Sequence, residues 1–241
     1  QKLQTTLNFR QNFGEDLTLT GKLSYLLENS DYEYYYGQGN TAVSGGRTIS
    51  LDNYTDAFIG SNETNAVTNN YFAILGLDYK DRYIFDGMYR IDQSSLFGEN
   101  HRTNDFFRVS AAYRISEDIE IPGIQELKIH TAYGTAGQRP QYNWQYTRRN
   151  ISNGIPSTSQ TVGNPNLRPS VTTEKEFGLN VDFLDRFHFE GVYSNAKTED
   201  QFMLVDLFAP SSAGSNQFQN IGTVEFNTLE LVLDAKIINN P

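Results

Sequence analysis

The sequence TVGNPNLRPSVTTEKEFGLNVDFLDRFHFEGVYSNAKT, residues 161–198, decides the fold of this chain. It begins as a loop rich in Asn, Pro and Gly and continues as two extended segments that meet at a tight corner, Leu184-Asp185-Arg186. Apolar side chains recur at every second position, namely at Phe177, Leu179, Val181 and Phe183 before the corner and at Phe187, Phe189 and Tyr193 after it. Alternation with this period on both sides of a tight turn predicts a long β-hairpin with one apolar face.

The same unit recurs along the chain, and the alternation predicts about nine strands in all. Besides the two arms of the hairpin, the expected strands lie at residues 1–10, 16–27, 71–79, 83–91, 106–116, 127–134 and 229–237. In the strand over residues 83–91, for example, Phe85 and Tyr89 alternate with Asp86 and Arg90. We therefore expect an all-β fold.

The connections between these strands alternate strictly between short and long. Short turns fall at residues 12–15, 81–82, 117–125, 184–186 and 239–241, and long loops at about 28–70, 93–104, 135–170 and 199–222. Outer-membrane barrels sort their connections in this way, with short turns in the periplasm and long loops outside the cell. Strands of about ten residues also suit a tilted crossing of the hydrocarbon layer. The whole chain, residues 1–241, is therefore predicted to be part of an antiparallel transmembrane β-barrel domain.

Composition excludes several other classes of protein. With 29 acidic against 19 basic side chains and a net charge of -10, the chain is a poor partner for nucleic acid. It has no cysteine, so disulfides and thiolate metal sites are excluded. No apolar run is long enough for a membrane helix. A mean hydropathy of -0.54 is nevertheless compatible with a barrel, because only every second strand residue of a barrel faces lipid.

The two faces of the expected strands differ in chemistry. Charged residues share the parity opposite to the apolar rows and are expected to line a wet interior: Arg90, Arg108, Arg114, Asp86, Asp92 and Asp182. Aromatic residues gather beside the turns and are expected to form an interfacial girdle: Tyr79, Tyr83, Phe183 and Phe187. The alternative is that these rings cap the core of a water-soluble protein.

No catalytic, metal or cofactor site is expected, and we predict that the chain is not an enzyme. The histidines, His101, His130 and His188, show no ligand spacing and are interpreted as polar residues of the lumen or loops. Phosphate-cradling glycine loops are absent. Gly163 and Gly178 are interpreted as turn and strand-packing glycines.

Aromatic residues on the long loops are the best candidates for a substrate vestibule, because flat rings stack on sugars or peptide side chains. One group is Tyr32, Tyr34, Tyr35 and Tyr36, and the other is Tyr142, Trp144 and Tyr146. Arg148, together with Arg149, is expected either to orient a carboxylate or to pair with the acidic loops. The alternative reading is that the rings pack loop against loop, or against a protein that covers them.

Several motifs resemble the SusC/RagA family of TonB-dependent outer-membrane transporters. The main one is Gly163-Asn164-Pro165-Asn166-Leu167-Arg168-Pro169, followed by Thr172-Thr173-Glu174, Gly178-Leu179 and Phe183-Leu184. Further matches, in one order over about residues 70–235, are Asn70-Tyr71-Phe72, Leu77-Asp78-Tyr79-Lys80, Arg90-Ile91-Asp92-Gln93-Ser94-Ser95-Leu96-Phe97-Gly98, Tyr113-Arg114-Ile115-Ser116, Ala132-Tyr133-Gly134 and Asn220-Ile221-Gly222-Thr223-Val224-Glu225. The resemblance implies a barrel of about 22 strands in the bacterial outer membrane. It also implies an N-terminal plug, coupling to the TonB complex and a SusD-like surface lipoprotein as partner.

The sequence departs from that family pattern in having no plug, TonB box, signal sequence or aromatic-terminated final strand. An odd number of strands, fewer than half a barrel, cannot close on itself, and open edges do not persist in lipid. We therefore expect a segment that pairs with the remainder of the same barrel, and contact with TonB through the missing N-terminal part. The expected function is import of oligosaccharides or peptides. Two alternatives are a secreted β-sandwich that binds glycans or acts as an adhesin, and a general porin.

Overall fold

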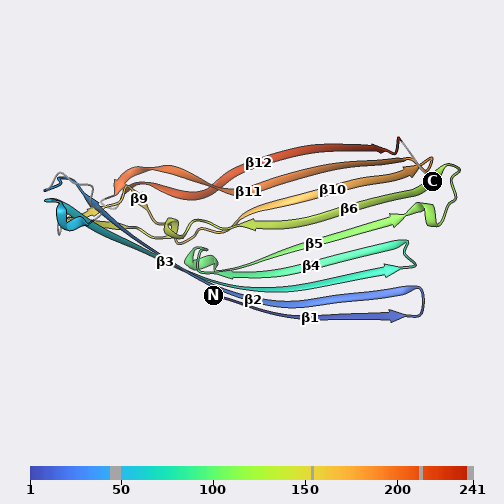
Figure 1. Ribbon diagram of the computed structural model, residues 1–241, viewed down its shortest axis with the longest axis horizontal. Helices are drawn as coiled ribbons and strands as arrows, with labels where there is room; N and C mark the ends of the chain where they lie inside the picture. Colours follow the sequence, from blue (N-terminus) through green and yellow to red (C-terminus); the bar gives the residue numbers. More distant parts are fainter. Residues whose placement is uncertain (44–49, 153–154, 212–213, 238–241) are drawn as a thin grey trace.

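A computed structural model describes residues 1–43, 50–152, 155–211 and 214–237. In the described residues nine long strands form one antiparallel sheet: β1 (Lys2–Phe13), β2 (Leu17–Gly39), β3 (Ala57–Tyr79), β4 (Tyr83–Ser94), β5 (Thr103–Arg114), β6 (Ile124–Gln138), β10 (Ser170–Phe183), β11 (Phe187–Ser211) and β12 (Gly214–Ala235). Each strand pairs with its neighbour in that order (Figure 1). The expected all-β fold is confirmed.

Short elements complete the structure. β9 (Thr161–Val162) adds a two-residue parallel pairing to β12, and β7 (Arg149–Ser152) pairs with β8 (Ile155–Thr158) in a separate ribbon. The described helices are 3-10 turns: η1 (Leu51–Asn53), η2 (Glu99–His101), η3 (Ile115–Glu117) and η4 (Tyr142–Gln145). No helix in the described part of the chain is long and apolar enough to cross a membrane.

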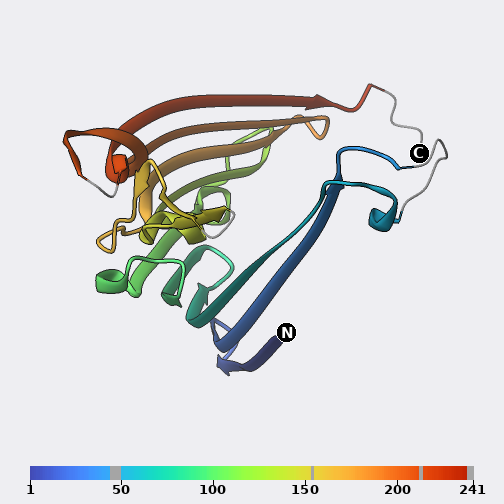
Figure 2. The same cartoon turned by 90° about the vertical axis from the view of Figure 1, so that its left-hand side faces the viewer.

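The sheet is one curved layer whose outermost long strands, β1 and β12, stay apart (Figure 2). Tight connections such as residues 80–82 and 184–186 gather at one end, and the long hairpins reach out at the other (Figure 1). The predicted sorting of short and long connections is therefore present in the structure.

The apolar rows of neighbouring strands join into a continuous face. Away from the bulges, the register pairs odd-numbered residues with odd-numbered residues across the sheet, as in Leu75↔Gly87, Gly87↔Val109 and Val109↔Tyr133. These side chains are not covered: Val109 is 50% exposed, and Leu75 is 53% exposed. A β-sandwich would bury such rows under a second sheet, so the structure does not favour that alternative.

Charged side chains occupy the opposite face, as predicted. There Arg108 pairs with Asp86, Arg90 Nε lies 3.0 Å from an oxygen of Asp92, and Arg114 Nε lies 3.5 Å from an oxygen of Glu126. In a closed barrel of this kind the polar face lines the lumen, where charges stay hydrated or paired. We refer to the two surfaces below as the apolar face and the polar face.

Aromatic side chains line the short-turn end of the apolar face. The rings of Tyr79 and Tyr83 lie 6.3 Å apart, and those of Tyr83 and Tyr113 lie 4.8 Å apart and nearly parallel. The Tyr83 and Tyr113 hydroxyls donate to Asp118 in the turn after β5, at 3.0 and 2.9 Å. These bonds, together with the nearby charge of Arg82, lower the pKa of Asp118 below its ordinary value.

The predicted loop boundaries need correction, because strands extend far into three of the loops. β2 and β3 pair continuously from Leu17↔Tyr79 to Gly39↔Ala57, so most of residues 28–70 is hairpin. Likewise β11 and β12 occupy most of residues 199–222, and β6 runs on to Gln138 inside the predicted loop 135–170. The loop 93–104 is also shorter, because β4 ends at Ser94 and β5 begins at Thr103. The reason is that a hairpin exposed on both faces shows no apolar alternation, although its backbone pairing is intact.

Candidate functional site

One segment, described over residues 139–152 and 155–169, crosses the polar face of the sheet, and we call it the crossing segment. Where β6 ends, Arg139 lies 3.5 Å from Thr68 Oγ1 and 3.4 Å from Asn70 Oδ1, both on β3. Farther along the segment, the ring of Trp144 stacks 4.0 Å from that of Phe218 on β12. Since β3 and β12 are far apart in the strand order, this segment spans the concave sheet from one side to the other.

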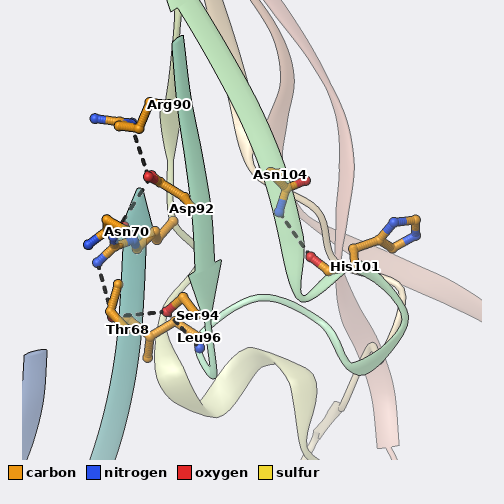
Figure 3. Close-up of polar contacts among 9 residues, drawn as sticks. Thr68, Asn70, Arg90, Asp92, Ser94, Leu96, His101 and Asn104 are labelled. Carbon is orange, nitrogen blue, oxygen red and sulfur yellow. Dashed lines mark hydrogen bonds and ion pairs between the residues drawn. The ribbon is translucent and has the colours of Figure 1, made fainter. Parts of the chain in front are cut away.

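The crossing segment and the β4–β5 connection bury polar groups of the sheet. Four polar-face residues are each 4% exposed: Thr68, Asn70, Asp92 and Ser94. Figure 3 shows them side by side on β3 and β4, with Arg90 paired to Asp92. The Ser94 hydroxyl lies 3.4 Å from that of Thr68 and accepts a hydrogen bond from the Leu96 backbone N–H at 3.2 Å. Hydrogen bonds of this kind stabilise buried polar atoms, whereas Arg90 Nε and Asp92 Oδ1 are held as an ion pair without a hydrogen bond.

The stretches that resemble the transporter family pack against each other. The Gly98 N–H donates to the Leu167 carbonyl at 2.7 Å, and the Asn100 side-chain amide donates to Asn166 Oδ1 at 2.6 Å. Phe97 and Leu167 are fully buried there and form, with Phe106, the small apolar core of the described residues. In the same connection Asn104 Nδ2 donates to the His101 carbonyl (Figure 3). The sequence motifs are therefore parts of one structural junction.

A third motif joins this junction from β12. Asn220 accepts a hydrogen bond from the Arg168 backbone N–H at 3.1 Å and donates one to the Arg168 carbonyl at 2.9 Å. The Arg168 guanidinium also pairs with Asp200 at 3.0 Å. This two-way contact with Asn220 fixes the backbone of the Asn-Pro-Asn-Leu-Arg-Pro loop on the β11–β12 hairpin.

A cleft lies between the crossing segment and the outer part of β3. Its volume is about 270 Å³, and its lining residues are Asn62, Glu63, Thr64, Gln141, Tyr142, Asn143, Tyr146 and Arg148. The rings of Tyr142 and Tyr146 lie 5.7 Å apart. Three of the predicted vestibule residues, Tyr142, Tyr146 and Arg148, are thus brought together.

The predicted tyrosine group lies on β2 and not in a loop. Tyr34 and Tyr36 stack with ring centres 5.7 Å apart, and Tyr32 and Tyr34 pair with Thr64 and Asn62 beside the cleft. Tyr35 has the opposite parity, is 70% exposed, and donates a hydrogen bond to Glu33 at 2.9 Å. The structure therefore places Tyr32 and Tyr34 opposite cleft residues, leaves Tyr36 stacked on Tyr34 farther out on β2, and separates Tyr35 from all three.

Trp144 lies near the cleft but does not line it. Its ring stacks on that of Phe218 and makes an edge contact with that of Phe202, with ring centres 4.0 and 5.2 Å away. Such ring contacts within the protein indicate a packing role. Two further residues were not predicted, namely Arg139 and Gln145. Gln145 is 6% exposed and donates to the Ser95 carbonyl at 2.8 Å. Both contact strands or loops that are distant in sequence, so no local pattern identifies them.

Two of the three histidines lie beside carboxylates of the sheet. His130 lies 3.6 Å from Glu176, and its ring covers Gly178, where a Cβ would lie 2.1 Å from it. This contact supports the strand-packing interpretation of Gly178. His188 pairs with Asp182. Within the described ranges, no group of three or more histidine or carboxylate residues could hold a metal ion.

The fold and junction define a segment of an outer-membrane β-barrel. A family model described as "TonB dependent receptor-like, beta-barrel" matches residues 1–237, so the chain belongs to that family, which is one of receptors and transporters and not of enzymes.

Curated relatives agree with this assignment. The chain is 27% identical to TonB-dependent receptor P26 of Formosa agariphila, over 96% of this chain and 25% of the relative. It is also 27% identical to TonB-dependent receptor SusC of Bacteroides thetaiotaomicron, over 78% of this chain and 21% of the relative. The chain therefore spans about a quarter of the length of these relatives.

Solved structures support the fold. The structure of the RagAB peptide transporter matches with a TM-score of 0.83 at 22% identity, over 99% of this chain and 28% of that chain. An open ten-stranded sheet that matches part of a larger barrel is consistent with the expected barrel segment. We conclude that the chain is a segment of an outer-membrane barrel.

Proposed function

We propose that this chain forms part of the wall and the extracellular vestibule of a TonB-dependent importer of oligosaccharides or peptides. Transport would proceed by conformational gating, with no bond made or broken. The observation that carries the proposal is the crossing segment, which places Tyr142, Tyr146 and Arg148 in one cleft beside the polar face. Rings and a guanidinium of this kind contact sugars, peptide side chains or carboxylates.

The relatives support this proposal through what their names state: two are TonB-dependent receptors, and one solved neighbour is a peptide transporter. We further propose that a SusD-like surface lipoprotein covers the long-hairpin end and that the TonB complex acts through a part of the protein outside this chain. The two free sheet edges would pair with the remainder of the same barrel, since unpaired strand edges are unstable in lipid.

A passive general porin is the alternative that uses the same fold. The two can be separated by measuring uptake of labelled oligosaccharides and peptides by cells that carry the full-length protein, with and without a functional TonB complex. The proposal predicts uptake of one of these classes and its loss when TonB is absent or the proton gradient is collapsed. Uptake that persists under both conditions would instead establish a passive channel. Co-purification of a surface lipoprotein tests the proposed partner separately.

A further inference from the structure

Arg139 connects strands that do not pair with its own strand. It follows β6 directly, yet its guanidinium contacts β3 at Thr68 and Asn70 and lies 3.9 Å from a carboxylate oxygen of Asp92 on β4. β5 separates β6 from β4 in the sheet. The arginine therefore bridges the concave polar face, and its planar fork suits several acceptors at once.

The carboxylate at the centre of this contact is buried. The side chain of Asp92 is 5% exposed, and the charged groups facing it are Arg90, with Nε at 3.0 Å, and Arg139. A buried carboxylate is stable only when charges and hydrogen bonds compensate its lost hydration. Removal of Arg139 would leave Asp92 with one cationic partner, so the ion pair between Arg139 and Asp92 favours the observed position of the chain at residue 139.

The cleft begins two residues after this anchor. Gln141 and Tyr142 line it, and Gln145 then makes a second attachment through the hydrogen bond to the Ser95 carbonyl. Residues 141–144 are thus held between two attachments, Arg139 and the buried Gln145. The opposite wall of the cleft is formed by Asn62, Glu63 and Thr64 on β3. Arg139 contacts the same strand at Thr68 and Asn70.

We propose that Arg139 is a positioning residue that sets the width of the vestibule cleft. By binding Asp92, Asn70 and Thr68, it fixes residues 141–148 relative to the outer part of β3, and it does not line the cleft itself. The importance of this width for transport rests on the proposed function. The width itself can be measured without any substrate, so failure of one claim can be distinguished from failure of the other.

The test measures the distance across the cleft in the full-length protein in lipid. Nitroxide labels are attached at Glu63→Cys and Tyr146→Cys, one on each wall, and pulsed electron paramagnetic resonance records the distance distribution. We expect a narrow distribution in the parent, a broader one with a longer mean in Arg139→Gln, and partial recovery in Arg139→Lys, which keeps the charge. Arg10→Gln, at an exposed position of β1, serves as the control and should leave the distribution unchanged.

An Arg139→Gln distribution that matches the parent would overturn the proposal. Folding of each variant is verified by gel electrophoresis, in which a folded barrel migrates differently in the unheated and the heated sample. Should Arg139→Gln not fold, Asp92→Asn carries the same test, because it keeps the shape of the side chain and removes the charge that Arg139 binds. We expect the same broadening, and an unchanged distribution in Asp92→Asn would equally overturn the proposal. If the label-to-label distance changes in Arg139→Gln but substrate uptake by the cells does not, the positioning role of Arg139 is supported. The proposal that substrate binds in this cleft is then contradicted.

Discussion

Gly98 lies directly on the backbone of Leu167. Its N–H donates to the Leu167 carbonyl at 2.7 Å, and a Cβ at Gly98 would lie 2.5 Å from that oxygen and 2.4 Å from the Pro165 carbonyl. Only glycine permits this approach without a backbone shift. Two motifs separated by about seventy residues of sequence are therefore joined through a position that excludes any side chain.

The first prediction concerns this contact. Gly98→Ala should separate the β4–β5 connection from the crossing segment and destabilise the junction by about 1–3 kcal/mol, the usual cost of overpacking. The measurement is the rate of limited proteolysis within the crossing segment of the folded full-length protein, which should rise. Gly87→Ala is the matched control, because nothing lies within 4 Å of a Cβ at that position. Equal cleavage rates in the two variants would contradict the contact described.

The second prediction concerns the attachment of the crossing segment to β12. Trp144→Ala removes the ring that stacks on Phe218 and contacts Phe202, so this end of the segment should loosen. Backbone amides of residues 141–147 should then exchange hydrogen faster, as measured by mass spectrometry of the reconstituted protein. Tyr146→Ala, which removes a 46% exposed ring, should have a smaller effect. If Tyr146→Ala accelerates exchange more than Trp144→Ala does, the packing role of Trp144 is wrong.

The sequence predicts the membrane-facing part of the structure well, for a physical reason. A strand between lipid and a wet lumen must alternate, and Phe85, Val109 and Phe177 carry that alternation visibly. The outer hairpins are different, because both of their faces meet water and polar residues such as Asn62 and Thr64 are then equally acceptable in strand or loop. The strand pairing of these residues follows from backbone hydrogen bonds, which leave no periodic pattern.

The cleft was predictable only in part. The aromatic cluster predicted Tyr142 and Tyr146 as substrate contacts, which stays a prediction, and the structure brings these two rings together. The sequence could not place Tyr35 on the opposite face from Tyr34, since residues 28–70 were expected to be a loop without parity. Nor could it find Arg139, whose partners on β3 and β4 lie about fifty to seventy residues away and are set by the crossing path alone.

A third prediction follows from the position of the rings. If the cleft receives substrate, Tyr142→Ala should raise the half-saturation concentration for uptake by about 2- to 12-fold, the equivalent of one lost ring contact. Tyr35→Ala removes a ring from the opposite face of β2 and should leave uptake unchanged. The measurement is concentration-dependent uptake by cells with matched amounts of folded protein. A larger effect from Tyr35 than from Tyr142 would place the vestibule on the other face of the hairpin.

The fourth prediction concerns pH at the short-turn end. Hydrogen bonds from Tyr113 and Tyr83, with the charge of Arg82, lower the pKa of Asp118 in the folded protein. A depressed pKa contributes stability that is present above the unfolded value and is lost as pH falls through the folded value. The melting temperature should therefore fall less between about pH 6 and about pH 3 in Asp118→Asn than in the parent.

Glu120→Gln is the control for this pH experiment, because the carboxylate that it removes is exposed and lies in the same turn as Asp118. Its melting temperature should depend on pH as the parent's does. Identical pH dependence in Asp118→Asn and the parent would show that the tyrosine hydroxyls do not stabilise the ionised carboxylate.

The most direct test of the membrane placement compares two neighbouring residues of β5. Val109 belongs to the apolar face and is 50% exposed, whereas Ser110 lies on the polar face in register with Asp86. Arginine at a lipid-facing position near the bilayer midplane costs about 2–4 kcal/mol, and arginine at a lumen-facing position is tolerated. The measurement is the free energy of unfolding of full-length Val109→Arg and Ser110→Arg in lipid vesicles. We predict a loss of about 2–4 kcal/mol for Val109→Arg only, and equal tolerance at both positions would contradict the barrel.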